Sequence, residues 1–298
     1  MIVSVGSIGI DTTRTPFKTA KDVLGGAATY SSLAASFFER THIVGVIGGD
    51  FPKEYMKIFK ERFGLSGLKI VKDGKTFRYD STFDYSLSTR KTNSTDLNVL
   101  AGFEPKIPSD LKKAEYVYLG NNDPEQNILA LKQFSNPKLS VCDTIDLWIN
   151  TKKDTVIEMM GKVDVTVLND EEIRLLTKQS SLIKAARDVL GWGSNSVIIK
   201  KGEHGTLLFS KDSVFPAPGF PLEDVVDPTG AGDSFGGGFI GHMARSKKAD
   251  FNTMKEAVIY GNVMGSFAVE DFSINKFLKI KLEDIEKRYE KYRNIVSF

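Results

Sequence analysis

The sequence predicts a doubly wound α/β protein, in which helices flank a mainly parallel β-sheet and a small β-sheet forms a lid. Short apolar segments alternate with amphipathic segments along most of the 298 residues, which is typical of consecutive βαβ units. Glycine turns follow several of the apolar segments, as expected where strands end. The segment 77–87 instead alternates with period two, which indicates an exposed strand with one apolar face.

The predicted elements follow one another in the order expected for such a sheet. The first part of the chain predicts a strand over 1–11, a small-residue helix over 27–38, a strand over 42–50 and an amphipathic helix over 52–63. After the lid, the predicted strands span 114–120, 138–143, 163–169 and 196–200, followed by a hairpin over 205–215. The predicted helices span 124–134, 151–160, 171–176, 182–190, 254–269 and 282–292. Residues 1–298 are therefore expected to form one domain.

The lid is predicted from residues 71–100, joined by residues 11–20. One face of the segment 77–87 is apolar and largely aromatic, and it consists of Phe77, Tyr79, Phe83, Tyr85 and Leu87. This is more aromatic surface than a lone strand leaves in water. We therefore predict a homodimer in which the two lids pack against each other. The alternative is a monomer whose lid packs on its own core.

Composition restricts the classes of function. Forty basic and 38 acidic residues leave a net charge of +2, which does not favour nucleic acid as a partner. The single cysteine, Cys142, excludes an internal disulfide and a multi-cysteine metal site. No apolar run reaches the roughly 18 residues that a membrane span needs, and the chain opens directly with a predicted strand. We therefore expect a cytoplasmic protein with no membrane partner.

The stretch that says most about function runs from Asp224 to Gly241, DVVDPTGAGDSFGGGFIG. Its glycine-rich turn leads onto the N-terminus of a helix whose apolar residues recur every four positions. Free backbone N–H groups at such an end attract anions. Asp233 lies in the same turn, where the positive end of the helix favours its ionised form. A phosphate site beside a carboxylate predicts phosphoryl transfer, with Asp233 as the base toward an acceptor hydroxyl.

Other interpretations of this stretch fit less well. A Walker loop is excluded because no Lys-Ser or Lys-Thr pair follows the glycines. Gly230, Gly232 and Gly236 form a loose dinucleotide fingerprint, with Asp250 downstream as a ribose-binding acid. That fingerprint normally opens directly from a strand in the first βαβ unit, whereas Pro228 interrupts the approach here. A dehydrogenase is therefore the weaker interpretation.

The residues DPTGAGDSFGGGF, 227–239, resemble the C-terminal signature of the ribokinase-like (PfkB) family of sugar and nucleoside kinases. The order and spacing of the motifs follow this family over nearly the whole chain. The resemblance implies a ribokinase-like fold, ATP and Mg²⁺ as cofactors, and transfer of the γ-phosphoryl group to a hydroxyl. It is specific for the family and not for any substrate.

The resemblance also implies roles for individual residues. Those of the anion hole and the catalytic base are Gly230, Ala231, Gly232 and Asp233. Those on the nucleotide side are Asn169, Glu172, Lys200, Gly202, Gly205, Thr229 and Asn262, with Glu172 acting on Mg²⁺ through water. Those on the acceptor side are Asp11, Gly25, Gly26, Tyr30 and Asp143. Asp227 and the carbonyl of Thr229 match a monovalent-cation site, for potassium, that several members have.

Another interpretation of the residues stays open at two of these sites. Asn169 followed by Glu172 three residues later also fits a capping box at the start of a helix. Tyr30 stands where the family usually has an Asn that contacts substrate hydroxyls. A phenol offers fewer hydrogen bonds than an amide, but its ring can stack on a base.

We therefore expect an ATP-dependent kinase that phosphorylates a primary hydroxyl of a small sugar or sugar acid. The alternative within the same chemistry is a nucleoside kinase of the adenosine type. A third interpretation, from another class, is a non-catalytic sensor that binds a sugar or a nucleotide. The presence of Asp233, Asn169 and Glu172 argues against the sensor.

Overall fold

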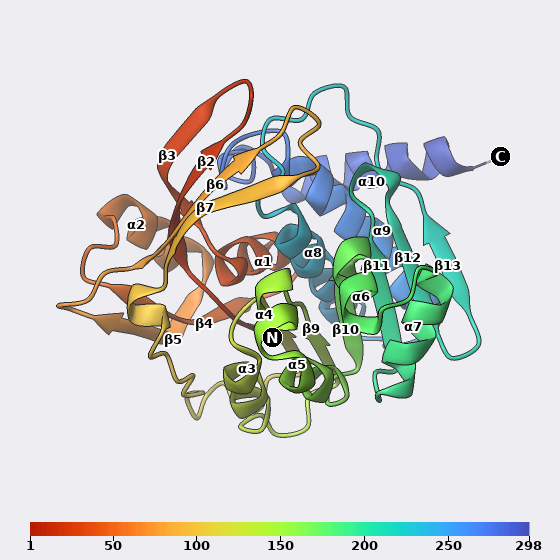
Figure 1. Cartoon of the computed structure of the whole chain (residues 1–298), viewed down its shortest axis with the longest axis horizontal. Helices are drawn as coiled ribbons and strands as arrows, with labels where there is room; N and C mark the ends of the chain where they lie inside the picture. Colours follow the sequence, from red (N-terminus) through yellow and green to blue (C-terminus); the bar gives the residue numbers. More distant parts are fainter. Residues whose placement is uncertain (298) are drawn as a thin grey trace.

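The computed structural model describes residues 1–297 as two sheets, with helices on both faces of the larger one (Figure 1). The larger sheet has the strand order β13-β12-β11-β10-β9-β8-β1-β4-β5. Its strands are β1 (Ile2–Val5), β4 (Thr41–Gly48), β5 (Gly64–Val71), β8 (Tyr116–Leu119), β9 (Leu139–Cys142), β10 (Val165–Asn169), β11 (Ser196–Lys200), β12 (Thr206–Ser210) and β13 (Val214–Ala217). Neighbours from β5 across to β11 pair in parallel, whereas β12 and β13 are antiparallel. The predicted doubly wound, mainly parallel sheet is confirmed.

Helices cover both faces of this sheet, which explains why its central strands are apolar on both sides. One face carries α1 (Ala27–Ser36), α2 (Lys53–Arg62), α8 (Ala231–Ser246), α9 (Phe251–Ala268) and α10 (Leu282–Val296). The other face carries α3 (Pro124–Leu131), α4 (Asp146–Thr151), α5 (Lys153–Met160), α6 (Asp170–Thr177) and α7 (Leu182–Gly191). Cys142 is fully buried in the second of these cores, as its apolar sequence context predicts. No helix among residues 1–297 is long and apolar enough to cross a membrane.

The smaller sheet stands over one edge of the larger one (Figure 1) and has the strand order β3-β2-β6-β7. Its strands are β2 (Gly9–Arg14), β3 (Thr19–Gly25), β6 (Phe77–Phe83) and β7 (Arg90–Asp96). The pair β2 and β6 is parallel, and the outer pairs are antiparallel. The single strand predicted over 1–11 is therefore wrong. It divides after Val5, because β2 leaves the main sheet to join the lid.

The strand predicted over 77–87 is also too long. It ends at Phe83, and Asp84 then accepts a hydrogen bond from the backbone N–H of Leu87 at 3.1 Å. Leu87 adopts a left-handed conformation with φ 57°, which closes the turn into β7. No glycine or proline marks this turn between Asp84 and Leu87.

Three further boundaries differ from prediction. The helix expected over 124–134 ends at Leu131, and the helix expected over 151–160 begins at Lys153 as α5, preceded by the unpredicted helix α4. The edge strand β5 was missed, because Gly64 and Gly67 interrupt its apolar pattern and most of its side chains are only partly buried. These errors lie at the edge and ends of elements, where local patterns are weakest.

The lid covers part of its aromatic face within the same chain. Phe83 is only 8% exposed, and the guanidinium of Arg90 lies over the ring of Tyr79 at 5.5 Å. Tyr85 is 82% exposed in the next turn, where its ring packs edge-on against Phe17 at 5.9 Å. The predicted homodimer through this face stays a prediction.

Candidate active site

The direction of the chain across the large sheet reverses at β1. The chain adds β4 and β5 on one side of β1 and then continues with β8 on the other side. In open α/β sheets, ligands bind at the carboxyl ends of strands beside such a reversal. Most of the residues singled out by sequence lie at this edge, under the lid.

The turn before α8 has the geometry that the glycine-rich motif predicts. Gly230 caps the helix with φ 75°, a left-handed conformation that glycine adopts without strain. A side chain there would also collide with the ring of Tyr30, which packs directly against this glycine. The first turn of α8 therefore presents its backbone N–H groups toward the end of the sheet, as an anion site requires.

Asp233 lies in this first turn and is partly exposed. Burial by the surrounding protein, reinforced by the nearby Asp143, raises the pKa of Asp233 to about 7, although Lys200 and Arg90 oppose the shift. The sequence predicted that the helix end would favour the ionised form. Desolvation outweighs that effect, which makes Asp233 a better base near neutral pH than an ordinary carboxylate.

Asp143 and Lys200 form a buried ion pair close to Asp233. Asp143 directly follows β9, Lys200 ends β11, and the ammonium lies 2.6 Å from Asp143 Oδ2. The hydroxyl of Tyr118 also donates to this carboxylate, at 3.3 Å. Asp143, expected on the acceptor side, is therefore engaged by two side chains of its own chain.

Asn169 and Glu172 form the capping box that was their alternative interpretation. Glu172 N–H donates to Asn169 Oδ1 at 2.7 Å, and Asn169 N–H donates to Glu172 Oε2 at 2.8 Å. The two roles are compatible, because Glu172 is nearly buried and faces the ion pair. Burial raises the pKa of Glu172 to about 8, with Lys200 opposing and Asp143 adding to the shift.

Asp11 lies in the lid strand β2 and not at the end of the first sheet strand. Its carboxyl is 5% exposed, and Oδ1 has no hydrogen-bond partner among residues 1–297. Burial, with Asp227 and Asp233 adding to it, raises the pKa of Asp11 to about 8. Gly25 and Gly26 lie beside it, and Gly26 has φ 95°. A buried carboxyl with a free oxygen is suited to receive hydroxyl groups of a ligand.

Asp227 and Thr229 lie on the approach to the motif turn. Asp227 is buried, and its Oδ1 accepts the backbone N–H of Thr229 at 2.9 Å. Thr229 Oγ1 lies 3.4 Å from Thr13 Oγ1 of β2, which brings the lid into contact with the turn. Potassium binding at Asp227 stays a prediction.

The two glycines predicted on the nucleotide side, Gly202 and Gly205, have different surroundings. Gly202, in the short 3-10 turn Gly202–His204, has φ 55° and open space where a side chain would point. Gly205, with φ 83°, instead packs on the carbonyl of Ala217. Gly202 thus leaves room for a ligand beside the chain, while Gly205 forms a structural turn.

Asn262 and Tyr30, for which ligand contacts were predicted, make contacts within the protein. The amide of Asn262 accepts from Thr206 Oγ1 at 3.4 Å and donates to Pro218 O at 3.2 Å. It therefore joins α9 to the β12–β13 side of the sheet. Tyr30 is 2% exposed beneath Gly230, so its ring is not free to stack on a base.

Arg90 is a candidate functional residue that the sequence analysis missed. It begins β7 in the lid, and its guanidinium lies within 3.8 Å of the carboxylate of Asp146 in α4. It lowers the pKa of Asp11, Glu172 and Asp233, so its charge acts on the whole carboxyl cluster. No motif surrounds Arg90 in the sequence. The only feature that could have identified it is its positive charge on the predicted lid.

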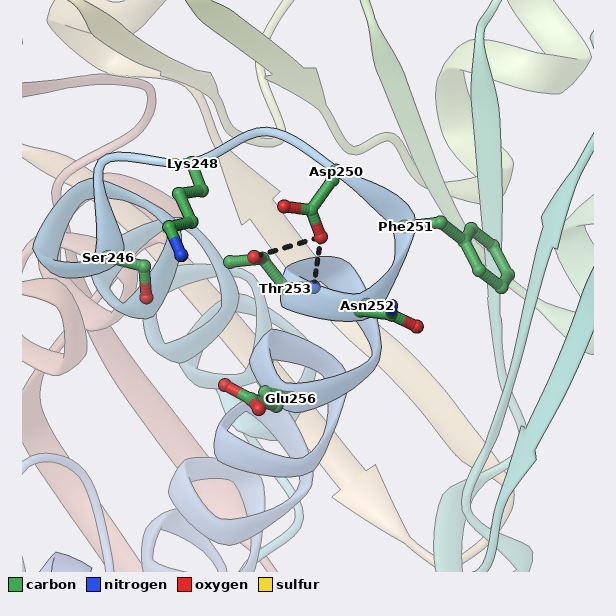
Figure 2. Close-up of a pocket in the computed structure, with 7 residues that line it drawn as sticks. All are labelled: Ser246, Lys248, Asp250, Phe251, Asn252, Thr253 and Glu256. Carbon is green, nitrogen blue, oxygen red and sulfur yellow. Dashed lines mark hydrogen bonds between the residues drawn. The ribbon is translucent and has the colours of Figure 1, made fainter.

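A pocket of about 490 Å³ lies at the opposite end of α8, away from the motif turn (Figure 2). Ser246, Lys248 and Glu256 are among the residues that line it. Figure 2 shows that Asp250 turns back onto its own helix, where Oδ1 accepts from the N–H of Thr253 at 2.9 Å and from its hydroxyl at 3.1 Å. Asp250 is thus the N-cap of α9 and does not face the glycine turn, which removes the dinucleotide interpretation.

An acid beside a free helix N-terminus, at the carboxyl edge of a doubly wound sheet, is typical of an α/β phosphotransferase. The chain belongs to the pfkB family of carbohydrate kinases, whose family model matches residues 1–280. The residues predicted from the signature thus lie in a kinase of the expected family.

Two relatives illustrate the range of acceptors in similar sequences. A cytidine kinase of Thermococcus kodakarensis is 29% identical over 83% of this chain and 89% of its own length. An inositol 3-kinase of Arabidopsis thaliana is 25% identical over 93% of this chain and 76% of its own length.

Solved structures match the fold along nearly the whole chain. A Burkholderia thailandensis nucleoside kinase in complex with inosine has a TM-score of 0.80 at 17% identity, covering 98% of this chain and 97% of the other. A ribokinase II from E. coli in complex with ATP and Mg²⁺ has a TM-score of 0.77 at 18% identity, covering 97% and 99%. These likenesses show the fold of the chain, and the second of these neighbours was solved with ATP and Mg²⁺ bound.

Proposed function

We propose that the protein is a nucleoside kinase that transfers the γ-phosphoryl group of ATP to the primary hydroxyl of a nucleoside, with cytidine as the first to test. The observation that carries this proposal is the 29% identity to a cytidine kinase over 83% of the chain. It favours the nucleoside alternative over the small sugar or sugar acid expected as the main acceptor. The inositol 3-kinase relative makes a polyol the second candidate acceptor.

In the proposed reaction, each side chain has the role that its position supports. The acceptor hydroxyl lies between Asp11 and Asp233, and its oxygen forms a bond to the γ-phosphorus. The bond from that phosphorus to the β-bridging oxygen breaks, and ADP leaves with the electron pair. The hydroxyl proton passes to the carboxylate of Asp233, late in a loose transition state. The N–H groups of the Gly230–Asp233 turn donate to the phosphoryl oxygens.

The nucleotide side fits a magnesium ion shared with the phosphates. Among residues 1–297, no three His, Cys, Asp or Glu side chains converge to hold a metal ion directly. Mg²⁺ usually keeps several waters and binds through phosphates and one or two carboxylates, which Glu172 and Asn169 can orient through those waters. When bound, the ion would offset the negative charge of the phosphates. Potassium at Asp227, with the Thr229 carbonyl, belongs to the same proposal.

The proposal is tested by measuring ADP release with ATP and Mg²⁺ over a panel of cytidine, uridine, inosine, adenosine, ribose, fructose and inositol. We expect the highest kcat/KM for a nucleoside, at least about 10-fold above any free sugar or polyol. A 10-fold ratio corresponds to a difference of about 1.4 kcal/mol in transition-state binding. A sugar or inositol with the highest value would overturn the acceptor class. Asp233→Asn should lower kcat by about 10²–10⁴ while ATP binding changes little. A variant with half the wild-type kcat would exclude Asp233 as the base.

A further inference from the structure

The buried ion pair of Lys200 and Asp143 lies at the centre of the candidate active site, next to the anion-binding turn. Lys200 ends β11 and Asp143 follows β9, so the pair spans the carboxyl end of β10, which lies between these strands. The side chains of Lys200 and Asp143 are 16% and 4% exposed. Water therefore screens this charge much less than it screens a surface lysine.

The ammonium of Lys200 lies against the first turn of α8. A side chain on Gly232 would place its Cβ 2.9 Å from Lys200 Nζ. Gly232 is the second residue of the helix, where backbone N–H groups have no carbonyl partner within the helix. An anion bound to these N–H groups therefore also meets the ammonium.

The charges of Lys200 and Asp143 both shift the pKa values of two other carboxyl groups of the site. Lys200 lowers the pKa of both Asp233 and Glu172, while Asp143 raises both. The pair thus acts electrostatically on both the proposed base and the carboxyl on the magnesium side. A phosphoryl group that reaches an acceptor beside Asp233 would lie near this ammonium, because Gly232 and Asp233 share the first turn of α8.

Lys200 keeps its charge in this setting. Burial alone would lower its pKa, but Asp143 and Glu172 outweigh burial, and the pKa of Lys200 is raised. An ammonium has three N–H donors, and Asp143 uses one of them. The others remain available to a phosphoryl oxygen without loss of the ion pair.

We propose that Lys200 is a catalytic residue that donates to the phosphoryl group during its transfer, and that Asp143 is a positioning residue that holds the ammonium beside Gly232. This inference rests on the phosphoryl transfer proposed above and is independent of the acceptor. It moves Asp143 from the acceptor side, where the sequence placed it, to the phosphoryl side. The competing explanation is that the pair only joins β9 to β11.

The two explanations differ in how activity responds when both charges are removed. Either single change leaves one buried charge without its partner, so both Lys200→Met and Asp143→Asn should destabilise the protein. The double variant Asp143→Asn with Lys200→Met has no uncompensated charge, and its melting temperature should recover relative to the singles. For a purely structural pair, kcat should recover with it. For a catalytic lysine, kcat should stay about 10²–10³-fold below the wild type.

A second measurement does not depend on turnover. ADP with aluminium fluoride and Mg²⁺ mimics the phosphoryl group in transfer, and its affinity can be compared with that of ADP alone by calorimetry. We expect the double variant to bind ADP within about threefold of the wild type but to lose at least about tenfold in affinity for the mimic, because only the mimic reaches Lys200. Lys200→Arg keeps the positive charge but changes the shape of the donor group. Its kcat should therefore lie between that of the double variant and that of the wild type.

Lys152→Met is the matched control. The ammonium of Lys152 forms an ion pair with Asp123 Oδ2 at 2.7 Å, and this pair lies away from the motif turn. This variant should keep both kcat and the affinity for the mimic. A double variant with kcat within threefold of the wild type would overturn the assignment of Lys200, and so would equal losses for ADP and the mimic. A wild-type protein that neither turns over nor binds the mimic more tightly than ADP would instead overturn the phosphoryl transfer itself.

Discussion

The carboxyl group of Asp11 occupies the space that a side chain on Gly25 would need. Both Cγ and Oδ2 of Asp11 lie where a Cβ on Gly25 would be placed. The two residues are diagonal neighbours on the paired strands β2 and β3, where Asp11 is opposite Val23 and Gly25 is opposite Gly9. The missing side chain at Gly25 therefore sets the position of the carboxyl that we assign to the acceptor.

Gly25→Ala should displace Asp11 and weaken acceptor binding. We expect kcat/KM for the acceptor to fall by about 10²-fold, because a shift of about 1 Å in a positioning group costs that much, while the KM for ATP stays unchanged. Steady-state kinetics with each substrate varied in turn measures the effect. Gly102→Ala is the control, since a side chain there meets nothing within 4 Å. An unchanged acceptor KM in Gly25→Ala would contradict the role of Asp11.

Asp11→Asn should stabilise the ligand-free protein at alkaline pH while impairing its activity. The pKa of Asp11 is raised by burial to about 8, so its contribution to stability is present at low pH and is lost as pH rises through about 8. An amide cannot ionise, and we expect unfolding at pH 8 to cost about 1–3 kcal/mol more in the variant.

Urea unfolding at pH 5 and pH 8 checks this expectation for Asp11→Asn. The gain should be larger at pH 8 than at pH 5, because the wild type loses stability over the whole range between its ordinary pKa of 3.8, in the unfolded chain, and its folded pKa of about 8. Asp96→Asn, at an exposed position of the same lid, should change stability at neither pH. A variant that is less stable than the wild type at pH 8 would mean that the carboxylate is compensated within the protein.

The rate should rise with pH through neutrality. A base must be ionised to accept a proton, and burial raises the pKa of Asp233 to about 7. Asp11 and Glu172, with pKa values raised to about 8, titrate in the same cluster. We expect kcat/KM to increase over roughly pH 6 to 8 and then to level off. A profile that is flat from pH 5.5 to pH 8 would show that no carboxyl of the cluster must lose its proton in this range.

Glu172→Gln should separate the capping role of this residue from its role toward magnesium. Glutamine can still accept the N–H of Asn169, so the capping box and the melting temperature should be retained. The Mg²⁺ concentration for half-maximal rate should rise several-fold, because the carboxylate is lost. Glu171→Gln, at the exposed neighbouring position, should leave the magnesium curve unchanged. A curve that coincides with the wild type for Glu172→Gln would limit Glu172 to capping.

Arg90→Gln should lower kcat for every acceptor that the protein accepts. The guanidinium acts on Asp11, Glu172 and Asp233 from the lid, and removing one such group from a reaction centre costs about 10²–10³ in rate. Lys91→Gln is the matched control, because Lys91 is exposed and points to the opposite side of the same strand. A loss seen with one acceptor only would assign Arg90 to acceptor specificity.

The sequence by itself determined the fold class and the motif turn. Alternating apolar segments are enough to predict strands and helices in a parallel sheet, because periodicity is a local property of the chain. The spacing of Gly230, Gly232 and Asp233 likewise predicts an anion-binding helix end, and α8 begins at Ala231 as expected. The capping box at Asn169 and Glu172 is local in the same way, since only three residues separate its members.

Tertiary structure alone decided which side chains meet. Asp11 belongs to the lid because β2 pairs with β6, whose residues follow 68 positions later in the chain. The contacts of Asn262 with Pro218 and of Tyr30 with Gly230 join segments that are distant in the chain. The raised pKa of Asp233 depends on Asp143, which is remote in sequence. Burial and charge depend on distances in space, and a pattern along the chain does not encode those distances.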